Sequence, residues 1–415
     1  MAYIDDLGKR ALEAKGRIAT ASTGEKDGIL EEITASLRRN VPEILRENEK
    51  DIADARENGI SDTMVDRLRL TEERILGIAD ACMDLVNLED PVGEILEGSL
   101  RPNGMRITKV RVPMGVVGII YESRPNVTVD AAALCIKSGN AAILRGGKEA
   151  IHSNKILMKI MQQAVASCGF PAETVQLVED TSREVSTQMM KANEYIDILI
   201  PRGGAGLIRA IVKNATVPVI ETGTGNCHIY VDELSDIDMA VDITDNGKTQ
   251  RPSVCNALET CLVHERVAEE FLPKLAERFQ AHQVEIRGCE RTRAILGDQV
   301  IPAAEEDYDT EFLDYIISIK VVDSIEEAIS HIGKYSTGHS ECIITKDYDH
   351  AEKFQREVDS ACVYVNCSTR FTDGGEFGLG AEIGISTQKL HVRGPMGLKE
   401  LTTMKYWING NGQVR

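Results

Sequence analysis

The feature that most constrains the fold is a repeated alternation of short apolar runs and amphipathic segments that begins near residue 116. The apolar runs, which read as strands, are 116–121, 141–144, 175–178, 196–200 and 217–221. The segments with helical periodicity are 128–138, 151–167, a stretch ending near 191, and 204–213. Apolar strands that alternate with amphipathic helices predict a parallel sheet covered on both faces, the doubly wound α/β architecture.

The second half of the chain repeats this pattern. Its expected strands are 258–264, 315–322, 342–345 and 361–366, and its expected helices are 236–245, 265–282, 324–335 and 348–358. This pattern predicts a second α/β domain, with a boundary near 223–226 because no long linker separates the halves.

The first ninety residues read as packing helices. Apolar residues at helical spacing run from Ile29 to Ile52 and end at Asn58-Gly59, and a second run opens at Thr71, a plausible N-cap. After them, 94–100 and 105–112 are expected to form a hairpin around the Asn103-Gly104 turn.

Ligands of such sheets belong in the loops at the carboxyl ends of the strands. Those loops span 121–126, 145–148, 201–206 and 221–226, and three of them are rich in glycine. Glycines let backbone N–H groups approach anionic oxygens, which favours a phosphorylated ligand, although a tight strand-to-helix turn would look the same. Arg145 and Lys148 flank Gly146-Gly147, where two cations suit a dinucleotide with an extra phosphate; a solvated loop is the alternative.

Cys255 is the candidate nucleophile. It lies in a polar loop with Lys248 and Arg251, whose charges would favour the thiolate, whereas an unperturbed thiol is mostly protonated at neutral pH. Most cysteines are small core residues. The cysteines that fit this second description, because they fall inside expected helices or strands, are Cys135, Cys261, Cys342 and Cys362.

Composition excludes several classes of protein. The charge balance is 47 − 66 = −19, which argues against general attraction to nucleic acid or anionic membranes. Neither a transmembrane run nor a secretory signal is evident, so a cytoplasmic protein is expected, and its ten cysteines are expected to be free thiols. No Cys-x-x-Cys pair exists, so no metal site is expected.

Six stretches together resemble the aldehyde dehydrogenase superfamily, and within it the branch that reduces an acyl phosphate of glutamate. The stretches are YESRPNVTVD at 121–130, IPRGGAG at 200–206, VIETGTGNCH at 219–228, QRPSVCNA at 250–257, YSTGHSE at 335–341 and YVNCSTRFTDGG at 364–375. The resemblance implies that Cys255 is the nucleophile. It also implies that NADPH reduces L-glutamyl 5-phosphate to L-glutamate 5-semialdehyde and phosphate through a cysteine thioester, the second step of proline biosynthesis.

Other site residues are carried over by position. The implied cofactor residues are Arg145, Gly146, Gly147, Lys148, Arg202, Gly203, Gly204 and Glu311. Lys148 stands where NAD-preferring members often have Glu, and a lysine would attract the 2′-phosphate of NADPH. Glu311 corresponds to a Glu that binds the nicotinamide ribose, although the Gly-Pro that usually follows is missing here.

The resemblance also implies a catalytic amide and a base. Asn126 is a candidate for the oxyanion amide beside the Cys255 main-chain N–H, in a loop whose length differs from the superfamily's. Glu221 occupies the place of a water-activating Glu, and it could take the thiol proton or be only a structural inheritance. The implied substrate ligands are Arg124, for phosphate or α-carboxylate, and Ser368, Thr369 and Arg370, which could equally be an ordinary polar turn.

The resemblance also fixes the expected domain plan: two Rossmann-like α/β domains plus an oligomerisation hairpin. The expected NADPH-binding domain is 1–93 and 114–223, with 385–399 returning to it; the catalytic domain is 224–384; the hairpin and its C-terminal strand are 94–113 and 400–415. A homo-oligomer is expected, because such a hairpin extends a neighbouring subunit's sheet. Transient contact with glutamate 5-kinase is a further possibility.

Two other functions compete with this interpretation. A hydrolytic NAD(P)-dependent aldehyde dehydrogenase would use Glu221 to activate water. A cofactor-binding module without catalysis, such as a scaffold for the kinase, would not depend on Cys255.

Overall fold

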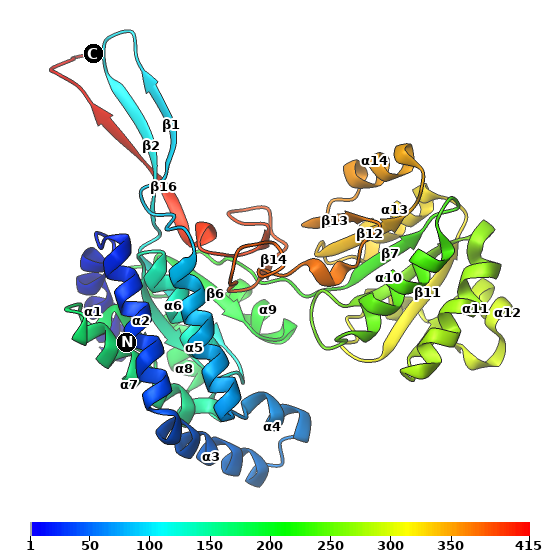
Figure 1. The fold of residues 1–415 in the computed structure, drawn as a ribbon, viewed down its shortest axis with the longest axis horizontal. Helices are drawn as coiled ribbons and strands as arrows, with labels where there is room; N and C mark the ends of the chain where they lie inside the picture. The colour runs from blue at the N-terminus through cyan, green and yellow to red at the C-terminus, as the bar shows by residue number, and fades with distance from the viewer. Residues whose placement is uncertain (1) are drawn as a thin grey trace. The chain divides into compact units, whose positions relative to one another are not determined.

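The structure, a computed structural model, describes residues 2–415 and divides into two compact units (Figure 1). Unit 1 runs up to Thr222 and also contains Gly378–Gly384 and Met396–Arg415, while unit 2 contains Gly223–Phe377 and Ile385–Pro395. Of the segment 385–399, which was expected to return to the first domain, only 396–399 belongs to unit 1, while Ile385–Pro395 belongs to unit 2. Gly378–Gly384, expected in the catalytic domain, belongs to unit 1. Within unit 2, β14 (Ile385–Ser386) pairs with β15 (Gly394–Pro395), and the main-chain N–H of Gly223 donates to the carbonyl of Ile385 at 2.8 Å.

The sheet of unit 1 has four parallel strands in the order β5-β4-β3-β6. The strands are β3 (Val116–Tyr121), β4 (Ala141–Arg145), β5 (Val175–Leu177) and β6 (Ile198–Arg202), and the helices that follow them are α6 (Asn126–Lys137), α7 (Ile151–Ser167), α8 (Arg183–Met190) and α9 (Ala205–Asn214). The alternation of strand and helix predicted from the sequence is therefore confirmed. Because these strands are parallel, the carboxyl ends of β3, β4 and β6 lie at the same edge of the sheet.

Side-chain alternation builds the two layers on this sheet. Val116 and Ile120 share a buried cluster with Ile4 and Leu7 of α1 (Ala2–Ile18). On the other face, the hydroxyl of Tyr121 bonds Thr128 of α6 at 2.6 Å. The sheet is thus covered on both sides.

The expected strand at 217–221 is wrong. Only an isolated bridge between Leu199 and Val219 forms there, in which the Leu199 N–H donates to the carbonyl of Pro218 at 2.8 Å and the Ile220 N–H donates to the carbonyl of Leu199 at 3.0 Å. Pro218 has no N–H to extend the ladder, so the segment stays a short contact at the sheet edge.

The N-terminal helices pack outside α6 and α7. They are α2 (Thr23–Arg39), α3 (Val41–Glu57), α4 (Asp62–Leu68) and α5 (Glu72–Asn87). The apolar run from Ile29 to Ile52 is two helices rather than one, because the chain turns at Asn40 and Pro42 starts α3 in the first turn, where its missing N–H has no cost. Thr71 caps α5 as expected, accepting the Arg74 N–H at 3.2 Å.

A three-stranded antiparallel arm extends from unit 1 (Figure 1). Its strands are β1 (Ile95–Leu100), β2 (Arg106–Pro113) and β16 (Thr402–Asn409), in the order β1-β2-β16. Both the hairpin and the C-terminal strand expected from the sequence are present. At the root of the arm, the buried Asn140 side chain donates to the carbonyl of Leu401 at 2.8 Å, while Leu100, Trp407 and Ile408 are exposed.

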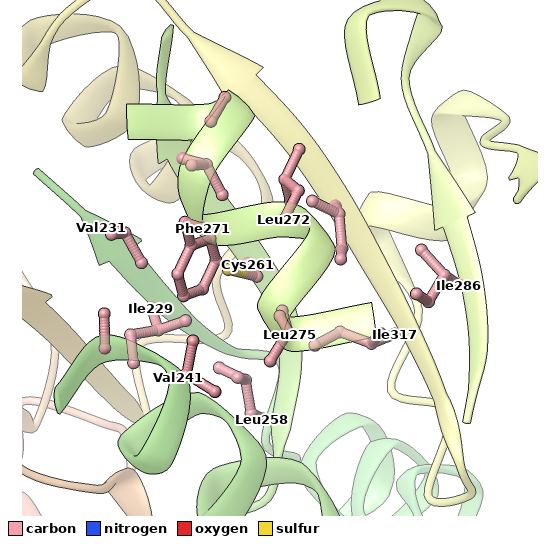
Figure 2. Close-up of a cluster of buried hydrophobic side chains, with 14 of the residues drawn as sticks. Ile229, Val231, Val241, Leu258, Cys261, Phe271, Leu272, Leu275, Ile286 and Ile317 are labelled. Atoms are coloured by element: carbon pink, nitrogen blue, oxygen red, sulfur yellow. The ribbon is translucent and has the colours of Figure 1, made fainter. Parts of the chain in front are cut away.

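Unit 2 is built on seven parallel strands in the order β10-β9-β11-β8-β7-β12-β13. The strands are β7 (Cys227–Val231), β8 (Leu258–His264), β9 (Glu285–Gly288), β10 (Ile301–Pro302), β11 (Ile316–Val322), β12 (Ser340–Ile344) and β13 (Cys362–Val365), and the helices are α10 (Ile237–Thr249), α11 (Glu265–Ala281), α12 (Glu290–Leu296), α13 (Ile325–Tyr335) and α14 (Tyr348–Glu357). One face packs on α10 and α11, where Phe271 and Leu275 meet Ile229 and Ile317 (Figure 2). The other face packs on α13 and α14.

The sequence reasoning missed β7, β9, β10 and α12. β7 is fully buried, yet it contains a cysteine and a histidine directly after a glycine-rich loop, which hid its apolar character. β9 and α12 are short and carry charged residues. No helix within residues 2–415 is long and apolar enough to cross a membrane.

Candidate active site

Cys255 lies in the loop between α10 and β8 and is half-buried. The Cys227 thiol, itself buried, donates to the Cys255 carbonyl at 3.2 Å. A Cβ on Gly225 would lie 1.4 Å from the same carbonyl oxygen, so only glycine fits beside the backbone of Cys255. The loop that ends in Gly225 and the start of β7 therefore fix the main chain of Cys255.

The expected role of Lys248 as a cation beside the thiol is not what the structure shows. Lys248 is fully buried in α10, and its ammonium lies 2.6 Å from the carboxylate of Glu259, which is also fully buried. The negative charge of this carboxylate offsets the potential of the ammonium at a neighbouring thiol, so Lys248 favours the thiolate less than an unpaired lysine would. Burial raises the pKa of Glu259 to about 7, against the lowering effect of Lys248.

Glu311 reaches the same region of unit 2. Its carboxylate accepts the Gly225 N–H at 2.7 Å, and burial raises its pKa while that hydrogen bond lowers it. Two residues on, the Leu313 N–H donates to Glu259 at 3.1 Å. Glu311 thus contacts Gly225, which in turn lies against the carbonyl of Cys255.

The turn that carries Ser368, Thr369 and Arg370 also lies against the loop of Cys255. The side-chain amide of Asn256 donates to the carbonyls of Arg370 at 3.2 Å and Thr372 at 2.9 Å. In return, the Thr369 hydroxyl donates to the carbonyl of Asn256 at 2.8 Å. Ser368 caps the turn by accepting the Arg370 N–H at 3.3 Å. The structure therefore joins Thr369 and Arg370 to the loop of Cys255 through Asn256, and Ser368 lies at the start of the same turn.

Sequence reasoning did not single out Asn256, Gly225 or Cys227, although all three lie inside the stretches that carry the family resemblance. Asn256 directly follows Cys255, and its buried amide is the feature that couples two segments more than a hundred residues apart in sequence. Only the fold shows that contact.

In unit 1, Arg145 ends β4, and its guanidinium donates to the carbonyl of Thr181 at 2.6 Å. Its Nε is buried and has no hydrogen bond to any residue within 2–415. Gly146 is enclosed, since a Cβ there would lie 2.2 Å from the Asn154 side chain, and Lys148 is exposed at the start of a short 3-10 turn. A tight buried backbone between two cations is a fitting cradle for an anionic ligand.

The loop Arg202-Gly203-Gly204 joins β6 to α9. Gly204 is the N-cap of α9, and its N–H donates to the carboxylate of Glu122 at 2.8 Å. A Cβ on Gly203 would lie 2.5 Å from the same carboxylate oxygen. An anionic oxygen therefore already sits at this helix N-terminus, where backbone N–H groups and the helix dipole favour negative charge.

Asn126 begins α6, and its side-chain amide donates to Asp130 at 2.8 Å. Burial raises the pKa of Asp130 to about 6, while Asn126 and Arg202 lower it. Arg124 is exposed in the same loop, and Glu221 is half-buried just before unit 2 begins. Asn126, Arg124 and Glu221 belong to unit 1 and Cys255 to unit 2, so their approach to the thiol stays a prediction.

The sequence profile of the aldehyde dehydrogenase family matches residues 2–294 and 301–406. A protein named gamma-glutamyl phosphate reductase from Clostridium perfringens (strain 13 / Type A) is 60% identical over 408 residues, which cover 98% of each chain. One of the same name from Carboxydothermus hydrogenoformans is 57% identical over 410 residues, 99% of each chain.

A crystal structure of gamma-glutamyl phosphate reductase from Thermotoga maritima superimposes with a TM-score of 0.97 at 51% identity, covering 99% of both chains. An acetylating aldehyde dehydrogenase from Geobacillus thermoglucosidasius, 18% identical with a TM-score of 0.71, shares the fold. By these full-length similarities, the chain belongs to the aldehyde dehydrogenase family, within its group of gamma-glutamyl phosphate reductases.

Proposed function

We propose that this chain reduces L-glutamyl 5-phosphate to L-glutamate 5-semialdehyde with release of phosphate, the second step of proline biosynthesis from glutamate. The observation that carries the proposal is the half-buried Cys255, whose loop is held by Cys227, Gly225 and Asn256 in a chain similar over its full length to proteins named for this reaction.

The reaction follows from a fixed thiol and an activated carbonyl. The Cys255 thiolate attacks the acyl carbon, the bond from that carbon to the phosphate oxygen breaks, and phosphate leaves with the bonding electrons. The product on the enzyme is a Cys255 thioester. After reduction, the tetrahedral species on Cys255 collapses, which expels the thiolate and forms the aldehyde.

Membership of this family implies a nicotinamide cofactor. We propose NADPH, which when bound supplies the hydride that reduces the thioester. Arg145 and Lys148 would hold its adenosine end, and the Arg202-Gly203-Gly204 backbone its diphosphate. Support comes from the Gly204 N–H, which donates to a carboxylate oxygen at the N-terminus of α9, and from the buried Nε of Arg145, which has no hydrogen bond within residues 2–415. The exposed cation of Lys148 would favour a 2′-phosphate over a free ribose hydroxyl.

Two tetrahedral species in this reaction carry an oxyanion, which requires hydrogen-bond donors. We propose the main-chain N–H of Cys255 and the amide of Asn126. Asp130 supports this role, because it takes one N–H of the Asn126 amide at 2.8 Å and so fixes the orientation of the other. Glu221 would take the thiol proton or serve structure alone. Glu311 would contact the nicotinamide ribose after releasing Gly225.

The arm formed by β1, β2 and β16 supports a homo-oligomer. Two of its three strands are sheet edges, and it exposes Leu100, Tyr406, Trp407 and Ile408, an unusual set for a free surface. We propose that this arm joins two or more copies of the chain in the cytoplasm. Transient contact with glutamate 5-kinase, which would shield a labile acyl phosphate from water, is part of the same proposal.

The reverse reaction tests the function most simply. Protein, glutamate semialdehyde and NADP⁺ or NAD⁺ are mixed with and without phosphate, and reduced cofactor is followed by absorbance. We expect phosphate-dependent turnover with NADP⁺ and much slower turnover with NAD⁺. Turnover independent of phosphate would favour a hydrolytic aldehyde dehydrogenase, in which Glu221→Gln would abolish acid formation.

A second comparison separates catalysis from cofactor binding alone. Cys255→Ser should abolish turnover while leaving cofactor binding intact. A wild-type protein that binds NADP⁺ but shows no turnover would favour the non-catalytic module.

A further inference from the structure

The substrate's two anionic groups are at very different distances from the reacting carbon. In an acyl phosphate, the phosphate is bonded directly to the carbonyl that Cys255 attacks. The α-carboxylate of the glutamyl group lies at the far end of a three-carbon chain. Cations that sit beside Cys255 will therefore meet the phosphate before they meet the carboxylate.

The fold holds the turn that carries Arg370 against the loop of Cys255 by three hydrogen bonds, all of which involve Asn256. Asn256, which follows Cys255 and is 5% exposed, donates to the carbonyls of Arg370 and Thr372 at 3.2 and 2.9 Å. The Thr369 hydroxyl donates to the Asn256 carbonyl at 2.8 Å. The turn that carries Arg370 and the loop that carries Cys255 thus behave as one piece.

The guanidinium of Arg370 is directed to the start of the same loop. Its Nε donates to the side-chain oxygen of Gln250 at 2.8 Å, next to the exposed Arg251. Gln250 is neutral, so this contact orients Arg370 without compensating its charge. Within residues 2–415, neither Arg251 nor Arg370 forms an ion pair with a carboxylate, although most other arginines of unit 2 do.

The electrostatics of the cluster agree with this geometry. Burial lowers the pKa of Arg370, and the like charge of Arg251 lowers it further, whereas Asp373, Cys255 and Cys227 raise it. Two arginines that repel each other beside a thiol are stabilised together when a dianion binds between them.

We propose that Arg370 and Arg251 form the subsite for the phosphate of the acyl phosphate substrate, and that Asn256 is a positioning residue that keeps Arg370 in register with Cys255. This inference rests on the proposed function. In the reductive direction the pair holds the leaving phosphate, whose charge grows as the bond from carbon to oxygen breaks. In the reverse direction the same pair binds inorganic phosphate for attack on the thioester.

The reverse reaction separates the two anionic groups, because phosphate and semialdehyde are then different molecules. The KM values for inorganic phosphate and for glutamate semialdehyde are measured with NADP⁺ for the wild type, Arg370→Gln, Arg370→Lys and Arg251→Gln. We expect Arg370→Gln to raise the KM for phosphate about tenfold or more, the size expected for loss of a charge-assisted hydrogen bond. The KM for semialdehyde should change less than about twofold, and Arg370→Lys should recover part of the loss.

Asn256→Ala should act in the same direction as Arg370→Gln: it should raise the KM for phosphate and leave the KM for semialdehyde unchanged. Arg356→Gln is the matched control: Arg356 is an exposed arginine of α14 paired with Glu352, and its loss should change neither constant. If Arg370→Gln does not fold, Arg370→Lys and Arg251→Gln test the same point, because each should raise the KM for phosphate and leave the KM for semialdehyde unchanged.

A rise in the KM for semialdehyde with an unchanged KM for phosphate would assign Arg370 to the α-carboxylate and overturn the proposal. No change in either constant would overturn it as well. Failure of the proposed function has a different signature, since the wild type itself would then show no phosphate dependence.

Discussion

His331 offers a test of the packing beneath the candidate site, because its replacement by phenylalanine should make the protein more stable. The imidazole is buried in α13 between Tyr308 and Tyr335, with ring centroids 5.0 and 4.5 Å away. Its Nε2 has no hydrogen-bond partner within residues 2–415. Phenylalanine keeps the aromatic contacts and removes a buried polar atom whose lost hydration costs about 1–3 kcal/mol.

The effect should grow as the pH falls. Burial lowers the pKa of His331 from 6.5 to about 3, with the nearby His228 adding to the shift. The folded state therefore stays neutral while the unfolded chain takes up a proton below about pH 6.5, so stability is lost as the pH falls. Between about pH 7.5 and pH 5, this linkage costs the wild type about 2 kcal/mol, a loss that His331→Phe does not suffer.

Urea unfolding followed by circular dichroism at the two pH values gives the difference, and amide hydrogen exchange in α13 assigns it to unit 2. His282→Phe, at an exposed position after α11, controls for loss of a histidine as such. If wild type and His331→Phe lose stability in parallel as the pH falls, His331 is not a buried neutral imidazole and the reasoning is wrong.

Three further changes probe the site. Gly225→Ala places a Cβ 1.4 Å from the Cys255 carbonyl, and should lower kcat/KM about a hundredfold, measured beside an unchanged NADPH fluorescence titration. Lys148→Glu should shift the ratio of kcat/KM for NADP⁺ over NAD⁺ at least about tenfold toward NAD⁺, since a carboxylate repels the 2′-phosphate; an unchanged ratio would place that phosphate elsewhere. Lys248→Met leaves Glu259 buried without its cation and should cost about 3 kcal/mol in urea unfolding, more than the double change with Glu259→Gln.

Hydrophobic periodicity was sufficient to predict the bounds of helices and strands whose apolar pattern is uninterrupted. β3, α7 and β8 begin and end where the sequence predicts them, because a fully buried strand or a long amphipathic helix leaves no alternative pattern. Hydrophobic periodicity gave wrong bounds where a residue's backbone preference interrupts an apolar run. Pro218 reduces an apolar run to a single bridge, and Asn40 divides one apolar stretch into two helices.

The candidate site was predictable to a similar extent. The loop of Cys255 stands out by its polarity, and the resemblance added the residues around it. The sequence did not show which side chains pair with one another. Lys248, which the sequence places near the thiol, forms an ion pair with Glu259, and the main chain of Arg370 is held by the side-chain amide of Asn256. Such pairings depend on which segments the sheet brings together, and no local pattern encodes them.

The central claim is that Cys255 carries the glutamyl group as a thioester that only phosphate discharges. Protein mixed with glutamate semialdehyde and NADP⁺, without phosphate, should release about one equivalent of NADPH per chain in a burst. Intact-mass and peptide analysis should then find a glutamyl group on the peptide that contains Cys255, and added phosphate should remove it. Continuous turnover without phosphate, or a burst that survives Cys255→Ser, would contradict the account.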